Sequence, residues 1–205
     1  MKKYIISIIS FLAGICTTNA KEYVPKVRFE SLRSDFLPSN EVRKLYQDSD
    51  GFIWIPTYNG LARYDGYDVL SYGTKDVVEG TFNPFVNVVE EDNCKNLWIG
   101  TECGLFRLDK ITGNIIADEY PELKDCNISA IIADDSGLWV GGDKGLYYKD
   151  NQKNDFEWLP LSYTDGHKLQ AVTSIVKDAH MNLWIASFGN ELLRYDIKKN
   201  ISYSY

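Results

Sequence analysis

Short apolar runs alternate with polar turns along most of this chain. In the first stretch, apolar-rich runs at 42–47, 52–56, 61–64 and 69–72 are separated by turns that contain Asp-Gly or Asn-Gly pairs. Such pairs supply the positive φ angles that tight hairpins need. Runs of this length between such turns predict an antiparallel meander of four strands, which we name a to d from the inside outward.

Strand b differs from the others because its apolar residues are consecutive rather than alternating. Its core reads Ile53-Trp54-Ile55, Leu97-Trp98-Ile99, Leu138-Trp139-Val140 and Leu183-Trp184-Ile185 in four successive units. A strand with this pattern is covered on both faces. Face-to-face packing of successive four-stranded sheets gives that cover, and it is the blade arrangement of a β-propeller.

The residue two places after each tryptophan supports close packing of the sheets. Gly100, Gly141 and Ala186 are small enough for a neighbouring sheet to approach closely. The first unit has Pro56 at this position, so we expect its strand b to be less regular.

The four tryptophans also define the period of the repeat. Trp54, Trp98, Trp139 and Trp184 are 44, 41 and 45 residues apart, and a period in the low forties is typical of radial or stacked arrays. We therefore predict an all-β fold with four four-stranded antiparallel propeller repeats, as part of a larger propeller, and a core role for the tryptophans. The repeats are expected at 42–85, 86–127, 128–171 and 172–205.

The N-terminus has the pattern of an export signal. Lys2 and Lys3 precede an apolar stretch at 4–15, and Thr18-Asn19-Ala20 has the small residues of a cleavage site. The apolar stretch is shorter than the roughly 20 residues that a membrane-spanning helix needs. We expect a signal peptide at 1–20, a lead-in segment with a closing strand at 21–41, and a periplasmic location.

The charge balance limits the kinds of partner. The chain has 22 basic and 29 acidic residues, and removal of residues 1–20 takes away two lysines, giving 20 against 29, or −9. An acidic surface without a basic cluster disfavours nucleic acid and anionic membranes as partners of this segment.

Cysteine placement leaves two alternatives open. Cys94, Cys103 and Cys126 remain after cleavage, and only Cys103 and Cys126 would lie on the same rim of one blade. A 103–126 disulfide and three free thiols are both compatible with the sequence, because spacing does not supply the strict geometry of a disulfide.

No motif points to catalysis, a metal or a cofactor. His167 and His180 lie in separate loops, whereas a zinc site needs about four clustered ligands. There is no nucleophile elbow, no phosphate-binding glycine loop and no Cys/His pair placed for nucleophilic work. We therefore predict no catalytic residue, no metal and no cofactor.

The turns after strand b are the candidate binding surface. The frame of the repeat is constant, but the residues about four places after each tryptophan vary, and a rigid scaffold with variable loops is how a binding surface is presented. Aromatic rings beside amides and carboxylates suit sugars. The alternative is that turn tips vary because nothing constrains them. The candidate ligand-binding residues are Tyr58, Asn59, Glu102, Asp143, Lys144, Phe188 and Asn190.

The repeated motif D-x-x-G-x-[LI]-W-I-G-T-x-x-G-L-x-R-Y-D resembles the two-component regulator propeller repeat. The segments at 28–32 and 37–42 resemble the lead-in that precedes the first blade of that family. The resemblance implies the periplasmic sensor of a hybrid two-component receptor, whose further blades, membrane helix and histidine kinase would be partners outside these residues. It also implies that the strand near 27–32 completes the last blade of a ring.

Two classes of function follow. The leading hypothesis is a sensory module that recognises a carbohydrate fragment, as a monomer or a homodimer, and signals to a kinase. The rival is an extracytoplasmic propeller enzyme acting on polysaccharide, a lyase or a glycosidase, and a protein-binding scaffold is a third alternative.

Overall fold

A computed structural model describes residues 36–73, 77–79, 82, 84–117, 120–189 and 192–205. All of them belong to one compact unit, residues 33–205. The predicted signal peptide and the predicted closing strand near 27–32 lie outside the described residues.

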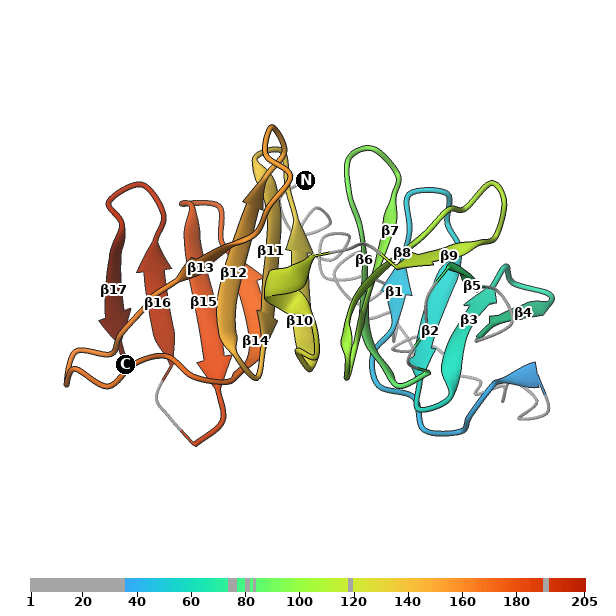
Figure 1. The fold of residues 1–205 in the computed structure, drawn as a ribbon, viewed down its shortest axis with the longest axis horizontal. Coiled ribbons are helices and arrows are strands. Elements are labelled where there is room, and N and C mark those ends of the chain that lie inside the picture. The colour runs from blue at the N-terminus through green and yellow to red at the C-terminus, as the bar shows by residue number, and fades with distance from the viewer. Residues whose placement is uncertain (1–35, 74–76, 80–81, 83, 118–119, 190–191) are drawn as a thin grey trace, which may run out of the picture. The chain divides into compact units, whose positions relative to one another are not determined.

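The described residues form four sheets that follow one another along the chain (Figure 1). Blade 1 consists of β1 (Tyr46–Gln47), β2 (Ile53–Thr57), β3 (Gly60–Tyr64) and β4 (Val69–Tyr72). Blade 2 consists of β6 (Val86–Glu91), β7 (Leu97–Thr101), β8 (Gly104–Leu108) and β9 (Ile115–Ala117). Blade 3 consists of β10 (Ile128–Ala133), β11 (Gly137–Gly142), β12 (Gly145–Asp150) and β13 (Glu157–Leu159). Blade 4 consists of β14 (Val172–Lys177), β15 (Asn182–Ser187), β16 (Leu193–Asp196) and β17 (Ile201–Ser204).

Each blade is an antiparallel meander, so the predicted fold class is confirmed. There are two additions. The segment Val77–Glu79 (β5) pairs in parallel with β9 and makes blade 2 five-stranded, and a short 3-10 helix, Pro121–Leu123, leads into blade 3.

Blade 1 is irregular, but in strand a rather than in strand b. The strand β2 is continuous through Pro56, which pairs with Leu61 of β3. The backbone nitrogen and carbonyl of Pro56 face strand a, where the Pro56 carbonyl accepts a hydrogen bond from the Arg43 N–H at 3.0 Å. Because proline has no N–H to donate to that ladder, β1 is reduced to two residues and an isolated bridge at Val42, whereas strand a of the other blades has six.

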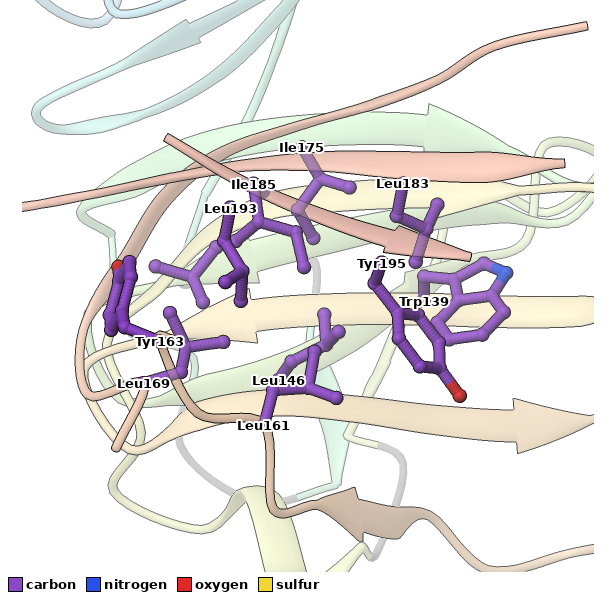
Figure 2. Packing of buried hydrophobic residues seen from close by; sticks show 12 residues of the cluster. Trp139, Leu146, Leu161, Tyr163, Leu169, Ile175, Leu183, Ile185, Leu193 and Tyr195 are labelled. Carbon is purple, nitrogen blue, oxygen red and sulfur yellow. The ribbon is translucent and has the colours of Figure 1, made fainter. Parts of the chain in front are cut away.

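Successive blades share hydrophobic cores. One buried cluster joins blades 1 and 2 through Trp54 and Ile99, and a second joins blades 2 and 3 through Trp98 and Ile131. The third joins blades 3 and 4, and Figure 2 shows Trp139 beside Tyr195 in this cluster. Face-to-face packing of the sheets is therefore the source of the core, as the apolar strand b predicts.

This packing requires glycine two residues after the tryptophan in blades 2 and 3. A Cβ on Gly100 would lie 2.7 Å from the Ile128 Cγ2 of the next blade, and one on Gly141 would lie 2.5 Å from the Val172 Cγ1. Real Cβ atoms do not approach so closely, so the predicted close approach of neighbouring sheets is confirmed at both positions.

The aspartate that opens each a–b turn ties the turn to the tryptophan. Trp98 Nε1 donates to Asp92 Oδ2 at 2.8 Å, while Asp92 Oδ1 accepts from the backbone N–H of Cys94 and of Asn96, each at 2.9 Å. The same indole–carboxylate bond recurs in the other blades, in the pairs Trp54–Asp48, Trp139–Asp134 and Trp184–Asp178. One carboxylate thus satisfies the turn and the polar end of a buried ring together.

Candidate functional site

Strand a carries a β-bulge at the same place in blades 2, 3 and 4. The pairing register shifts between Val86 and Val88, between Ile128 and Ala130, and between Val172 and Ser174. A bulge leaves one residue out of the ladder and re-aims its side chain. The residues left out are Asn87, Ser129 and Thr173, and Arg43 has the same repeat position in blade 1.

These four polar side chains line one pocket with a volume of about 410 Å³, which we call the inner pocket. The other lining residues come from positions next to the bulges and from turns on the same rim, the one formed by the b–c turns and the d–a loops. Among the described residues, the lining consists of Arg43, Lys44, Asn87, Glu102, Asn127, Ser129 and Thr173.

The carboxamides of the inner pocket are held by hydrogen bonds. Asn87 Nδ2 donates to Asn127 Oδ1 at 2.9 Å and to the Ile128 carbonyl at 3.0 Å. The backbone N–H of Asn127 donates in turn to Asp143 Oδ1 at 2.9 Å. A chain of polar contacts therefore runs from the b–c turn of blade 3 to strand a of blade 2 and fixes the Asn87 side chain.

The hydroxyl groups are fixed in a similar way. Ser129 Oγ donates to the Val172 carbonyl of the next blade, and Thr173 Oγ1 donates to the Ala186 carbonyl at 3.2 Å. A hydroxyl that has donated its proton still accepts through its oxygen lone pairs. The inner pocket thus offers ordered acceptors from Ser129 and Thr173 beside its cationic donors.

Two cations and one carboxylate set the charge of the inner pocket. Arg43 and Lys44 are exposed and Glu102 is half-buried. Within the described part of the chain, no ion pair joins any of these three side chains to another residue. The charges of Arg43 and Glu102 are therefore available to a ligand, whereas the Lys44 charge also acts on the Glu90 carboxyl group.

Lys44 also influences the half-buried carboxyl group of Glu90 in β6. Burial raises the pKa of Glu90 to about 7, against the opposing effects of the Lys44 charge and a hydrogen bond from the Ala133 backbone. The Glu90 carboxyl therefore titrates near neutral pH, so its charge changes across the physiological range.

Of the ligand-binding residues predicted in blades 1 and 2, Glu102 lies in the inner pocket and Tyr58 lies beside one of its lining residues. The exposed Tyr58 ring lies 4.2 Å from the Phe85 ring, between centroids, and the Arg43 guanidinium is 5.9 Å from the Tyr58 centroid. Asn59 is an exposed turn tip next to Tyr58.

Three predicted residues of blades 3 and 4, Asp143, Lys144 and Phe188, do not line the inner pocket. Asp143 accepts from the Asn127 N–H, and Lys144 Nζ donates to the Lys124 carbonyl at 2.7 Å, so both hold the d–a loop. Phe188 is 83% exposed, and Asn190 lies outside the described residues.

The structure adds residues that the sequence comparison missed, above all Arg43, Asn87, Ser129 and Thr173. The signal was present: each follows the first apolar residue of its repeat, in Val42-Arg43, Val86-Asn87, Ile128-Ser129 and Val172-Thr173. The turns after the tryptophans draw attention instead, because variation between the repeats is easiest to see there.

The opposite rim, formed by the a–b and c–d turns, joins the blades by ion pairs. Lys110 Nζ lies 3.1 Å from Asp48 Oδ2, 2.7 Å from Asp50 Oδ2 and 2.5 Å from Glu91 Oε1. The three carboxylates are close enough to hold a metal ion, but the Lys110 ammonium is the cation among them. Although burial alone lowers the pKa of Lys110, its hydrogen bonds to these carboxylates raise that pKa above the ordinary value.

A second pocket, about 580 Å³ in volume, lies on this rim between blades 1 and 2. Its lysines, Lys95 and Lys110, are already paired with Asp50 and the neighbouring carboxylates. These ion pairs between Lys95, Lys110 and the blade 1 aspartates hold blades 1 and 2 together on this rim.

The cysteine alternatives are resolved against a disulfide. Cys103 is exposed and Cys126 is buried, and the two are not bonded to each other. Cys126 Sγ instead lies 3.2 Å from Asp143 Oδ1, and burial together with this carboxylate raises its pKa to about 11. The Cys126 thiol is therefore a packed, protonated group, and the 103–126 disulfide that rim topology allowed is not formed in this structure.

Similarity to known proteins extends to a short stretch of the sequence and to the fold. Residues 37–59 match the family described as two component regulator propeller. No curated protein sequence matches the chain. Among the residues that the structure describes, no helix has the length and apolar character to cross a lipid bilayer.

Several solved structures share the fold. The extracellular domain of a hybrid two component system from B. thetaiotaomicron aligns with a TM-score of 0.71 at 21% identity, over 86% of this chain and 26% of that one. Another extracellular domain from B. thetaiotaomicron, described as part of a one component system, aligns at 0.65 and 21%, over 87% and 27%. Virginiamycin B lyase from Staphylococcus aureus aligns at 0.62 and 18%, over 82% and 56%.

This chain thus spans about a quarter of the length of the two extracellular domains. At these identities the alignments establish the fold and nothing finer. Residues 37–59, at the start of the first repeat, match the two component regulator propeller family, which confirms the resemblance noted in the sequence, and the four sheets are blades of a β-propeller.

Proposed function

We propose that this chain is the extracytoplasmic, ligand-sensing propeller segment of a two-component receptor, and that it recognises a carbohydrate fragment in the inner pocket. The observation that carries the proposal is the convergence of one polar side chain from the same repeat position of each blade on a single pocket. A stacked array buries its apolar residues between blades, whereas these polar side chains line a pocket at its inner edge, where Asn87 and Ser129 also bond to the next blade.

The chemistry of the inner pocket favours a sugar. Carboxamides, hydroxyls and charged groups bind the closely spaced hydroxyls of a carbohydrate through hydrogen bonds. The exposed Tyr58 ring, next to Arg43, adds a flat apolar face of the kind that covers a sugar ring. A glycan fragment satisfies both features.

The same residues count against an enzyme. A glycosidase needs two carboxyl groups that face each other across the scissile bond. In the described part of the lining, Glu102 is the single carboxylate of the inner pocket. Binding without turnover therefore fits the site better than hydrolysis, although enzymes such as the lyase share the fold.

The last described blade supports a larger propeller. Trp54, Trp98 and Trp139 are buried, whereas Trp184 is partly exposed, and Val176 in β14 is 60% exposed. A further blade packed on blade 4 would cover this face as blade 4 covers blade 3. An antibody against residues 21–205 tests this directly. A membrane-bound product several-fold heavier than 23.4 kDa supports a receptor, and a soluble product of about 23.4 kDa contradicts the receptor proposal.

The ligand proposal is tested by measuring binding and turnover on the same glycans. The purified chain is applied to an array of plant, host and microbial oligosaccharides, and each glycan that binds is then incubated with the protein and analysed for products by mass spectrometry. Binding without cleavage supports a sensor. Cleavage would establish an enzyme, and capture of a protein partner with no glycan bound would favour a scaffold.

A further inference from the structure

We infer that the ligand of the inner pocket is an acidic sugar, one that carries a carboxylate or a sulfate group. This inference rests on the proposed function, since it names the class of glycan that the same pocket would take. It begins with Arg43, the blade 1 member of the polar set.

Arg43 is a cation held in place without a carboxylate partner. Its backbone N–H donates to the Pro56 carbonyl at 3.0 Å, and its guanidinium lies 5.9 Å from the centroid of Tyr58, whose ring packs on Phe85. Among the described residues, no salt bridge involves Arg43. In a chain with a formal net charge of −7, acidic partners are abundant, so an arginine that lines a pocket without one is notable.

The charge of the lining points the same way. Among the described lining residues, Arg43 and Lys44 contribute two positive charges and Glu102 one negative charge, which gives a net charge of +1, and the others are neutral. On the opposite rim, by contrast, Lys110 is neutralised by three carboxylates. The inner pocket is therefore a locally positive site on an acidic protein, and such a site attracts anions.

The donor geometry suits a planar or tetrahedral oxyanion on a sugar. A guanidinium donates two parallel hydrogen bonds to a carboxylate or sulfate, and these charge-assisted bonds are stronger than neutral ones. Asn87, Ser129 and Thr173 then face the hydroxyls of the same ring or of the next one. A neutral glycan would leave the charge of Arg43 unmatched.

The test compares acidic and neutral glycans on the same array, followed by titration calorimetry at low and high salt. The probes are uronate-bearing and sulfated oligosaccharides, and for each uronate the same glycan with its carboxyl groups reduced to alcohols. Arg43→Gln is the test variant, Glu102→Gln removes the one negative charge, and Lys198→Gln, an exposed lysine in the c–d turn of blade 4, is the matched charge control.

We expect an acidic glycan to bind, the reduced form to bind at least about 10-fold more weakly, and salt to weaken the acidic complex. Arg43→Gln should weaken that complex at least about 10-fold, Glu102→Gln should tighten it, and Lys198→Gln should leave it within about twofold. Equal binding of the reduced glycan, or tighter binding of neutral glycans, would overturn this inference while the sensor proposal stands. Failure of every glycan on the array would overturn both.

Discussion

The packing of blade 3 on blade 4 makes Gly141→Ala a quantitative test of the fold. A Cβ at this position would lie 2.5 Å from Val172 Cγ1 and 3.0 Å from both Val172 Cβ and Ile175 Cδ1. Overpacking of a well-filled core costs about 1–3 kcal/mol. Replacing glycine in a strand returns roughly 0.5–1 kcal/mol of chain entropy. We therefore expect a net destabilisation of about 0.5–2 kcal/mol.

The assay is urea unfolding followed by tryptophan fluorescence, with Gly73→Ala as the control. A Cβ on Gly73 would have no atom within 4 Å, and its φ is not in the left-handed range, so that substitution should be neutral or slightly stabilising. Equal behaviour of the two variants would refute the close packing of these blades.

A double-mutant cycle identifies the clashing atoms. Val172→Ala alone creates a cavity and destabilises the protein, but it removes the Cγ1 that Gly141→Ala meets. The double variant should be more stable than the sum of the single effects predicts, by about 1 kcal/mol. Strict additivity would show that the clash lies elsewhere.

Three further outcomes are expected. Burial raises the pKa of Glu90 to about 7 from 4.5, so its contribution to stability is complete below about pH 4.5 and is lost as pH rises through 7. Glu90→Gln should therefore stabilise the fold at pH 8 by on the order of 2 kcal/mol. The same variant should reduce the change in the thermal unfolding midpoint between pH 5 and 8. Asp92→Ala removes the acceptor of Trp98 Nε1 and of two turn N–H groups, and should cost about 1–3 kcal/mol in urea unfolding, with a change in emission; an unchanged midpoint would contradict that role. Hydrogen bonds to Lys110 and Lys95 lower the pKa of Asp50 to about 2, so its contribution to folding stability is present above about pH 3.8 and is lost as pH falls through 2. Lys110→Met should reduce this acid-induced loss of stability. An identical acid unfolding transition in the variant would refute the pairing.

The sequence was sufficient to predict the fold because the signals that specify each blade lie close together in the chain. The apolar run around Trp98 and the turn opened by Asp92 lie within a few residues of each other, and they specify a strand, a hairpin and a covered face together. Even the irregularity of blade 1 was signalled by Pro56. Its effect was expected in strand b and falls on strand a, because the missing N–H faces that neighbour.

The site was harder to predict because it depends on contacts between repeats. Asp143 and Lys144 vary along with the other turn residues, yet they are used to hold their own d–a loop. The position of Asn87 depends on a bulge and on Asn127 of the next blade, which no single repeat encodes. Comparing the residue after the first apolar position of each repeat would have found it.

The most direct test of a ligand site at the inner edge of the blades is hydrogen exchange with and without a bound glycan from the array. We predict slowed exchange at the strand a bulges, in peptides that cover 86–88, 128–130 and 172–174. The a–b and c–d turns of the opposite rim should be unchanged. Protection confined to the turns around Lys95 and Lys110 would place the ligand in the 580 Å³ pocket and contradict this account.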